Sequence, residues 1–174
     1  MTLQSSQFVV LLTKPDAASG YVAAQDNPNA SWGGFASKTP VASGSSNNLF
    51  APVDAAGAEA GQTDYACVAI ANLSGADTAQ GVAVAIVDAA GGGVYSIGLD
   101  PVGIVSLTSV AAQGTSIGSA FAAPAGVTFS SGPLVVGNLP PNMCVLVWVR
   151  CVLAAGTPGT AADACDISAT ATTS

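Results

Sequence analysis

The segment NNLFAPVDAAGAEAGQTDYACVAIANLSG, residues 47–75, contains the change in composition that decides the fold. It begins as a polar loop, continues through a short acidic stretch, and ends in the first long apolar strand, DYACVAIANL at residues 64–73. Successive side chains of a strand point to opposite faces, and both faces are apolar here. One face carries Tyr65, Cys67, Ala69, Ala71 and Leu73, and the other carries Ala66, Val68 and Ile70. Such a strand lies in the middle of a sandwich or is covered by a second subunit.

The next apolar segment, residues 81–87, follows after a turn at residues 74–77. We expect it to pair antiparallel with residues 64–73. Residues 88–93, DAAGGG, are glycine-rich but lack the spacing, helix and lysine of a phosphate-binding loop. We therefore expect them to form a hairpin tip.

Further short strands are indicated along the rest of the chain, separated by turns. They lie at residues 94–99, 127–129, 134–136, 143–153 and 165–172. Residues 102–122 are rich in Ala, Gly and Ser and give no clear order of elements. Because no stretch carries a helical apolar stripe, about seven to nine strands predict an all-β fold, an antiparallel β-sandwich. The immunoglobulin-like form is favoured, and a jelly roll is the alternative.

Residues 143–153, MCVLVWVRCVL, form the most hydrophobic of these segments and place Trp148 and Arg150 on one face. Trp148 is the largest single side chain that a core could use. Arg150 must reach the rim or pair with a carboxylate, because an unpaired buried charge costs several kcal/mol. With Tyr65 and Cys67, these residues are the candidates for a core or interface strand.

Residues 1–46 differ in character from the sandwich body predicted at residues 47–174. Residues 7–13 predict a short strand that Pro15 ends, whereas residues 16–48 follow no strand or helix period. We expect an extended arm that docks on its own body or on a neighbouring subunit, with local packing over the sandwich edge as the alternative. Deleting residues 1–46 is then expected to leave a folded body. The side chains available to anchor the arm are Tyr21, Trp32, Phe35, Leu49 and Phe50.

The charge content suggests permanent partners. Only 7% of the residues are charged and the formal net charge is −7, whereas ordinary soluble domains have about 25% charged residues. A surface so poor in charge favours an assembly subunit whose apolar surface is covered; an Ala-rich soluble monomer is the alternative. The three cations, Lys14, Lys38 and Arg150, are dispersed, so we expect no nucleic-acid partner.

A membrane partner is not expected either. The longest apolar runs are well short of the ~20 residues that span a bilayer. The N-terminus has no positively charged region and too short an apolar core for a secretory signal. We therefore expect Met1 to be the mature start.

The residue inventory argues against an enzyme. The chain contains no His, which excludes Ser-His and Cys-His nucleophile pairs. Nearly all of its ten acidic residues fall at expected turns or strand ends, where Asp forms local hydrogen bonds. We expect no catalytic residues.

The four cysteines are Cys67, Cys144, Cys151 and Cys165. They form no CxxC pair, and without His they do not complete a zinc site, so we expect no metal and no cofactor. Cys144 and Cys151 are too far apart in one strand to bridge each other. A bridge from Cys67 or Cys165 to one of them stays open, but buried free thiols in a protein assembled in the cytosol are favoured.

Several short motifs follow one another along nearly the whole chain. They are DNPNASWGGFAS (26–37), NNLF (47–50), GAEA (57–60), TDYACVAIAN (63–72), SIGLDPVG (96–103), PAGVTFS (124–130) and GNLPPNMCVLVWVR (137–150). In this order they resemble a family of virion structural proteins of tailed bacteriophages. The chain departs from the family at Ala66 and Cys151, where members tend to have basic residues. The resemblance implies a virion location after assembly in the host cytoplasm.

The resemblance also implies a non-enzymatic role. The favoured role is a minor capsid or decoration (cement) protein that contacts the major capsid protein and forms a homotrimer or another symmetric oligomer. An acidic protein fits the outside of a capsid better than the DNA-lined inside. A tail or neck component, with tail subunits as partners, is one alternative. A host-glycan-binding immunoglobulin-like module is another.

Overall fold

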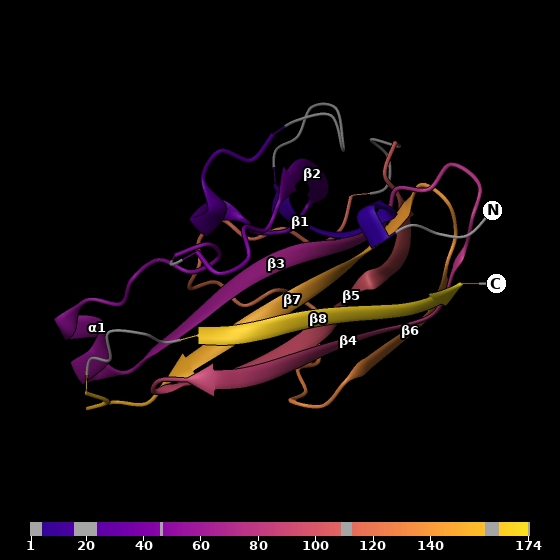
Figure 1. Cartoon of the computed structure of the whole chain (residues 1–174). Helices are drawn as coiled ribbons and strands as arrows, with labels where there is room; N and C mark the ends of the chain where they lie inside the picture. Colours follow the sequence, from indigo (N-terminus) through magenta and orange to yellow (C-terminus); the bar gives the residue numbers. More distant parts are fainter. Residues whose placement is uncertain (1–4, 16–23, 46, 109–112, 159–163, 174) are drawn as a thin grey trace.

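The computed structural model describes residues 5–15, 24–45, 47–108, 113–158 and 164–173, which form two antiparallel sheets packed as a sandwich (Figure 1). The strands are β1 (Phe8–Lys14), β2 (Phe35–Pro40), β3 (Gln62–Asn72), β4 (Ala79–Ala90), β5 (Gly93–Ser106), β6 (Leu134–Leu139), β7 (Met143–Leu153) and β8 (Ala164–Thr173). The short helical segments are η1 (Ser5–Gln7), η3 (Pro28–Ala30) and α1 (Ala55–Ala60). The larger sheet has the order β2-β1-β3-β7-β5, and the smaller sheet has the order β6-β4-β8.

The prediction of an all-β antiparallel sandwich is confirmed, and the strand order adds detail to it. Each connection from β3 to β8 joins a strand of one sheet to a strand of the other. In an immunoglobulin domain, by contrast, strands A and B, D and E, and F and G are consecutive and share a sheet. The strand order therefore differs from the immunoglobulin order that the sequence favoured.

The expected pairing of residues 64–73 with residues 81–87 is wrong. β3 pairs with β1 and β7, and β4 pairs with β6 and β8. The apolar side chains of β3 and β4 pack against each other between the sheets instead, because each strand has an apolar inner face to bury. The glycines at positions 91 and 92 therefore link the two sheets rather than forming the tip of a paired hairpin.

β3 buries both of its faces, as its alternation predicts. Ala66, Val68 and Ile70 belong to the inner core between the sheets. Cys67 and Ala69 belong to an outer core on the opposite side of the larger sheet. The side chains from outside the sheet that cover this outer core include Trp32, Leu107, Ile117, Val127 and Phe129. The outer face of β3 is thus covered by other parts of the same chain, and not by the second subunit that was the alternative.

The N-terminal region is built into the larger sheet. β1 pairs with β3 from Phe8 opposite Asn72 to Leu12 opposite Val68, which confirms the short strand predicted near residues 7–13. β2 pairs with β1 and forms the edge of the same sheet. Over these residues the structure shows sheet strands rather than an arm outside the body. The physical reason is that the N-terminal part of β1 has apolar side chains for both cores.

Residues 32–34 hold the cover of the outer core in place. Gly34 donates a backbone hydrogen bond to Thr115 over 2.9 Å, and Ile117 donates one to Trp32 over 3.0 Å. Gly33 has a φ of +84°, and a Cβ at this position would lie 2.6 Å from Cζ2 of Trp148. Gly33 is therefore required where the backbone packs closely on the indole ring of Trp148, and Gly34, with a φ of +81°, is required where the backbone approaches Lys14 and Pro15.

Candidate functional site

The anchor residues expected for the arm separate into two groups, both packed on the protein's own body. Tyr21 lies outside the described residues. Trp32 and Phe35 lie at or near the start of β2, where Phe35 is buried and Trp32 is half-buried against the outer core. Leu49 and Phe50 belong to the inner core, and the Phe50 ring lies 6.2 Å from the Tyr95 ring between centroids. Trp32 has a buried indole nitrogen without a hydrogen-bond partner among the described residues.

Trp148 is fully buried, and it lies in the outer core rather than between the sheets. Its indole Nε1 donates a hydrogen bond of 2.9 Å to Oδ2 of Asp100. Asp100 is itself only 2% exposed and also accepts hydrogen bonds from the backbone amides of Val102 and Thr115, each 3.0 Å long. This buried carboxylate therefore accepts hydrogen bonds from β5 (Val102), from β7 (Trp148) and from the loop that covers the outer core (Thr115).

Arg150 lies at the margin of the outer core, where it meets a hydroxyl group and aromatic rings. Its Nε donates to Oγ of Ser96 over 3.0 Å, and its guanidinium carbon lies 4.8 Å from the centroid of the Phe129 ring. The Phe129 ring in turn packs against Tyr65, with 5.8 Å between ring centroids. Ser96 thus accepts one of the five guanidinium N–H donors, and the Phe129 ring forms a cation–π contact with the group.

Two of the cysteines are inert in chemical terms. Cys67 and Cys144 are buried in the outer core as free thiols, which confirms the expectation for this pair. Burial raises the pKa of Cys67 well above its usual value, and burial raises the pKa of Cys144 to about 12. Both thiols are thus protonated at neutral pH and unsuited to act as nucleophiles or metal ligands.

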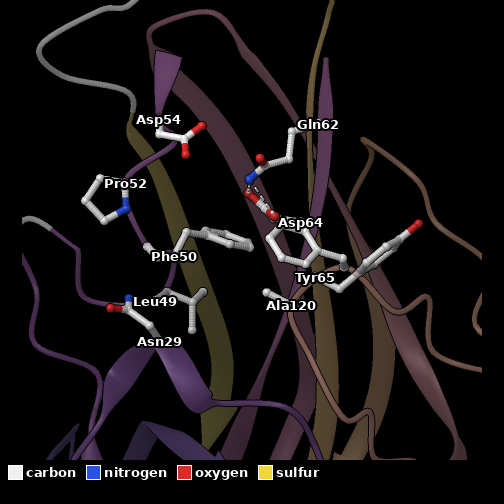
Figure 2. Close-up of a pocket in the computed structure, with 11 residues that line it drawn as sticks. Asn29, Leu49, Phe50, Pro52, Asp54, Gln62, Asp64, Tyr65 and Ala120 are labelled. Atoms are coloured by element: carbon white, nitrogen blue, oxygen red, sulfur yellow. Dashed lines mark hydrogen bonds between the residues drawn. The ribbon is translucent and has the colours of Figure 1, made fainter. Parts of the chain in front are cut away.

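A pocket that was not predicted from the sequence lies beside the first half of β3. We call it the Asp64 pocket. It has a volume of about 140 Å³. Its lining residues are Asn29, Leu49, Phe50, Ala51, Pro52, Asp54, Gln62, Asp64, Tyr65, Ala120 and Phe121. Figure 2 shows Leu49, Phe50 and Pro52 on one side of this space and Tyr65 with Ala120 on the other.

The pocket exists because β1 pairs with only part of β3. The pairing ends at Val68, so the edge of β3 before that residue faces loops instead of a strand. The backbone amide of Cys67 donates a hydrogen bond of 2.7 Å to the carbonyl oxygen of Ser31. The backbone amide of Tyr65 donates one of 2.7 Å to the carbonyl oxygen of Ala120. These two bonds hold separate loops against the edge of β3, with the pocket between them.

The main polar group in the pocket is the Asp64 carboxylate. Asp64 is 6% exposed, and Nε2 of Gln62 donates to both of its oxygens, at 3.0 Å and 2.8 Å (Figure 2). Burial raises the pKa of Asp64 because the charged form loses hydration, and the hydrogen bond from Gln62 partly opposes that rise. A perturbed carboxylate in a pocket is a typical feature of a binding site.

Asp54 supplies a second carboxylate to the pocket and caps α1. Its Oδ1 accepts a hydrogen bond of 2.8 Å from the Gly57 amide, as expected for an N-cap residue. Asn29 contributes an amide group that donates to the Asn47 carbonyl over 3.0 Å. In the sequence, Gln62 and Asp64 lie on the same face of β3 as Ala66, Val68 and Ile70, and this polar pair at the start of an apolar face was the signal that could have located the pocket.

The described residues offer little for other kinds of chemistry. They contain no group of three or more His, Cys, Asp or Glu residues that could hold a metal ion. Among the described residues, no helix is long and apolar enough to cross a membrane. Comparison of the chain with protein-family models, with curated proteins and with solved structures finds no match.

Proposed function

We propose that this protein is a non-enzymatic structural subunit of a virion, specifically a decoration or minor capsid protein on the outer shell of a tailed bacteriophage. The observation that carries the proposal is the character of one broad surface, the outer face of the smaller sheet. The order of sequence motifs described above supports the viral setting. The partner in this proposal is the major capsid protein.

The outer face of the smaller sheet is formed by side chains that alternate with those of the inner core along β4, β6 and β8. The inner-core side chains of β8 are Cys165, Ile167, Ala169 and Ala171. The outward side chains of the three strands include Gln80, Ala83, Ala85, Val87, Val135, Asn138, Asp166, Ser168, Thr170 and Thr172. Asp166 is the single charged residue among them.

A sheet face that meets water normally alternates with polar and charged side chains. Here Val135 is 78% exposed and Val87 is 57% exposed, and small or hydroxyl side chains lie beside them. Apolar exposed surface with few charges is typical of a contact area. The outer core of the larger sheet needs no such partner, because the chain itself covers it.

The overall charge supports a position on the outside of a capsid. A formal net charge of −7 with only three cations favours separation from packaged nucleic acid. A tail or neck subunit is the alternative within the same class, and it would use the same face.

The proposal is tested by introducing a charge on this face. Val135→Glu is expected to leave folding unchanged, because the side chain is mostly exposed, and to reduce occupancy on particles that lack the native protein. Occupancy is measured by cryo-electron microscopy or by co-sedimentation with the particles. Ser43→Glu, which adds the same charge in an exposed turn between β2 and the Asp64 pocket, is the matched control.

Equal occupancy of wild type and Val135→Glu on the capsid would contradict the use of this face. Binding of the wild-type protein to tails and not to capsids would favour the alternative role.

A further inference from the structure

We infer that the Asp64 pocket receives a single arginine side chain from a partner subunit. The inference deepens the proposed function, because it presumes that the protein works within an assembly. It adds a specific point of recognition, separate from the outer face of the smaller sheet.

The size of the pocket selects the kind of ligand. Its volume of about 140 Å³ is close to the ~150 Å³ of an engineered protein cavity that binds one benzene molecule. A guanidinium group with its adjoining methylene groups has about as many heavy atoms as benzene. A hexose has about twice as many, so the pocket is too small for the glycan that a host-binding module would recognise.

The charge of the lining selects a cation. The lining includes the carboxylates of Asp54 and Asp64 and the amides of Asn29 and Gln62, and no basic side chain is among the lining residues. A carboxylate has about four sites for accepted hydrogen bonds. Nε2 of Gln62 is the donor that reaches Asp64, which leaves capacity for the donors of a guanidinium group.

The Asp64 carboxylate is also energetically suited to such a ligand. Burial raises its pKa because the anion is deprived of water, with Gln62 as a neutral partner. A cation beside it would restore a favourable interaction for the charged form. Arginine is the usual residue for partly buried interface ion pairs, because its planar donors match a carboxylate.

Aromatic side chains complete the chemistry. Phe50 lies along one wall (Figure 2), and Phe121, which is 66% exposed, also lines the pocket. A guanidinium group stacks favourably on such rings. The protein already contains this combination once, where the guanidinium group of Arg150 lies over the Phe129 ring.

The test uses the full-length protein and two short peptides, acetyl-Gly-Arg-Gly-amide and its citrulline counterpart. Citrulline has nearly the shape of arginine without the charge. The arginine peptide is expected to bind saturably and to shift the NMR signals of the Gln62 side-chain amide. The affinity of the citrulline peptide is expected to be lower by a factor of about ten or more, because citrulline cannot form a charge-assisted contact.

Two substitutions locate the binding. Asp64→Asn keeps the shape of the side chain and is expected to reduce affinity for the arginine peptide about tenfold. Asp77→Asn removes the same charge from the segment between β3 and β4, outside the pocket lining, and is expected to leave affinity unchanged. If Asp64→Asn fails to fold, the comparison of the two peptides on the wild-type protein still decides the question.

The inference is overturned by equal binding of the two peptides, by an equal loss of affinity in the two variants, or by no saturable binding. Tighter binding of a third peptide, acetyl-Gly-Lys-Gly-amide, than of the arginine peptide would also overturn it. Because these measurements need no particles, their failure leaves the Val135→Glu test of the proposed function intact. Conversely, if the Val135→Glu experiment contradicts the proposed function, the peptide measurements still show whether the pocket binds arginine.

Discussion

Trp148 and Asp100 link two strands of the larger sheet through a single hydrogen bond inside the outer core. Trp148→Ala would remove both the packing and the donor, and is expected to cost about 3–5 kcal/mol of unfolding free energy. Trp148→Phe would keep most of the packing but leave Asp100 short of one donor, at a cost of about 1–3 kcal/mol. Urea denaturation followed by circular dichroism measures both. An unchanged midpoint for Trp148→Ala would show that the ring does not support the core.

Gly33 combines a backbone requirement with a packing requirement, and a second glycine separates the two. Gly33 and Gly44 have φ angles of +84° and +73°, but only Gly33 has neighbours within 4 Å of an added Cβ. Gly44→Ala is therefore expected to cost about 1–2 kcal/mol, from the left-handed conformation alone. Gly33→Ala is expected to cost clearly more, because the methyl group meets the Thr115 carbonyl oxygen and the Trp148 ring.

Thermal or urea unfolding of the two glycine variants provides the comparison. Equal losses of stability would mean that the approach of residue 33 to the indole ring does not constrain the fold.

Single residues also show where prediction from the sequence ends. The alternation from Tyr65 to Leu73 predicted both faces of β3, because a period of two is a local property of the backbone. Asp64 opens the strand expected at residues 64–73, and the sequence marks it as a carboxylate at the start of an apolar face without fixing its burial. That burial depends on Leu49, Phe50 and Ala120, which reach it only through the tertiary fold.

At the scale of elements, strand positions were more predictable than strand partners. Most strands were located from their apolar runs, but the pairing of β3 with β4 was predicted wrongly. When both faces of a strand are apolar, its sequence does not distinguish a neighbour in the same sheet from one in the facing sheet. Residues 102–122 could not be ordered for a related reason, and residues 127–129, predicted to form a strand, lie outside the strands of the structure. Their apolar side chains, among them Ile117 and Phe129, are irregularly spaced and dock one at a time on the outer core.

β1 is the element whose role the structure changes most. It pairs with the second half of β3 and buries Leu11 in the outer core and Leu12 in the inner core. Deletion of residues 1–46, which removes β1 and β2, is therefore expected to abolish cooperative unfolding instead of leaving a stable body. Leu12→Ala is a milder change in the same strand and is expected to lower the free energy of unfolding by about 2–5 kcal/mol.

Circular dichroism melting curves distinguish the two views of this region. A deletion variant with a sharp transition near that of the full chain would restore the view of residues 1–46 as a separable arm.

At the scale of the whole molecule, the large exposed apolar side chains of the described residues, apart from Val53 and Phe121 at or near the Asp64 pocket, form two groups. Val87 and Val135 lie on the outer face of the smaller sheet, and Val94, Val102 and Ile104 lie along β5, the edge strand of the larger sheet. A capsid decoration protein that is also a symmetric oligomer needs two surfaces, one for the capsid and one for its own copies. We assign the first surface to the capsid and the second to self-association.

This assignment predicts separable effects of two similar substitutions. Val94 is 65% exposed, so Val94→Glu should fold normally, and sedimentation velocity is expected to show a shift from oligomer to monomer. Val135→Glu should remain oligomeric while losing particle binding. Because the β5 contact is apolar, wild-type self-association should change little with salt, whereas a contact between charged surfaces would weaken. A wild-type protein that stays monomeric at high concentration would contradict the oligomer, and the opposite pattern in the two variants would exchange the roles of the two surfaces.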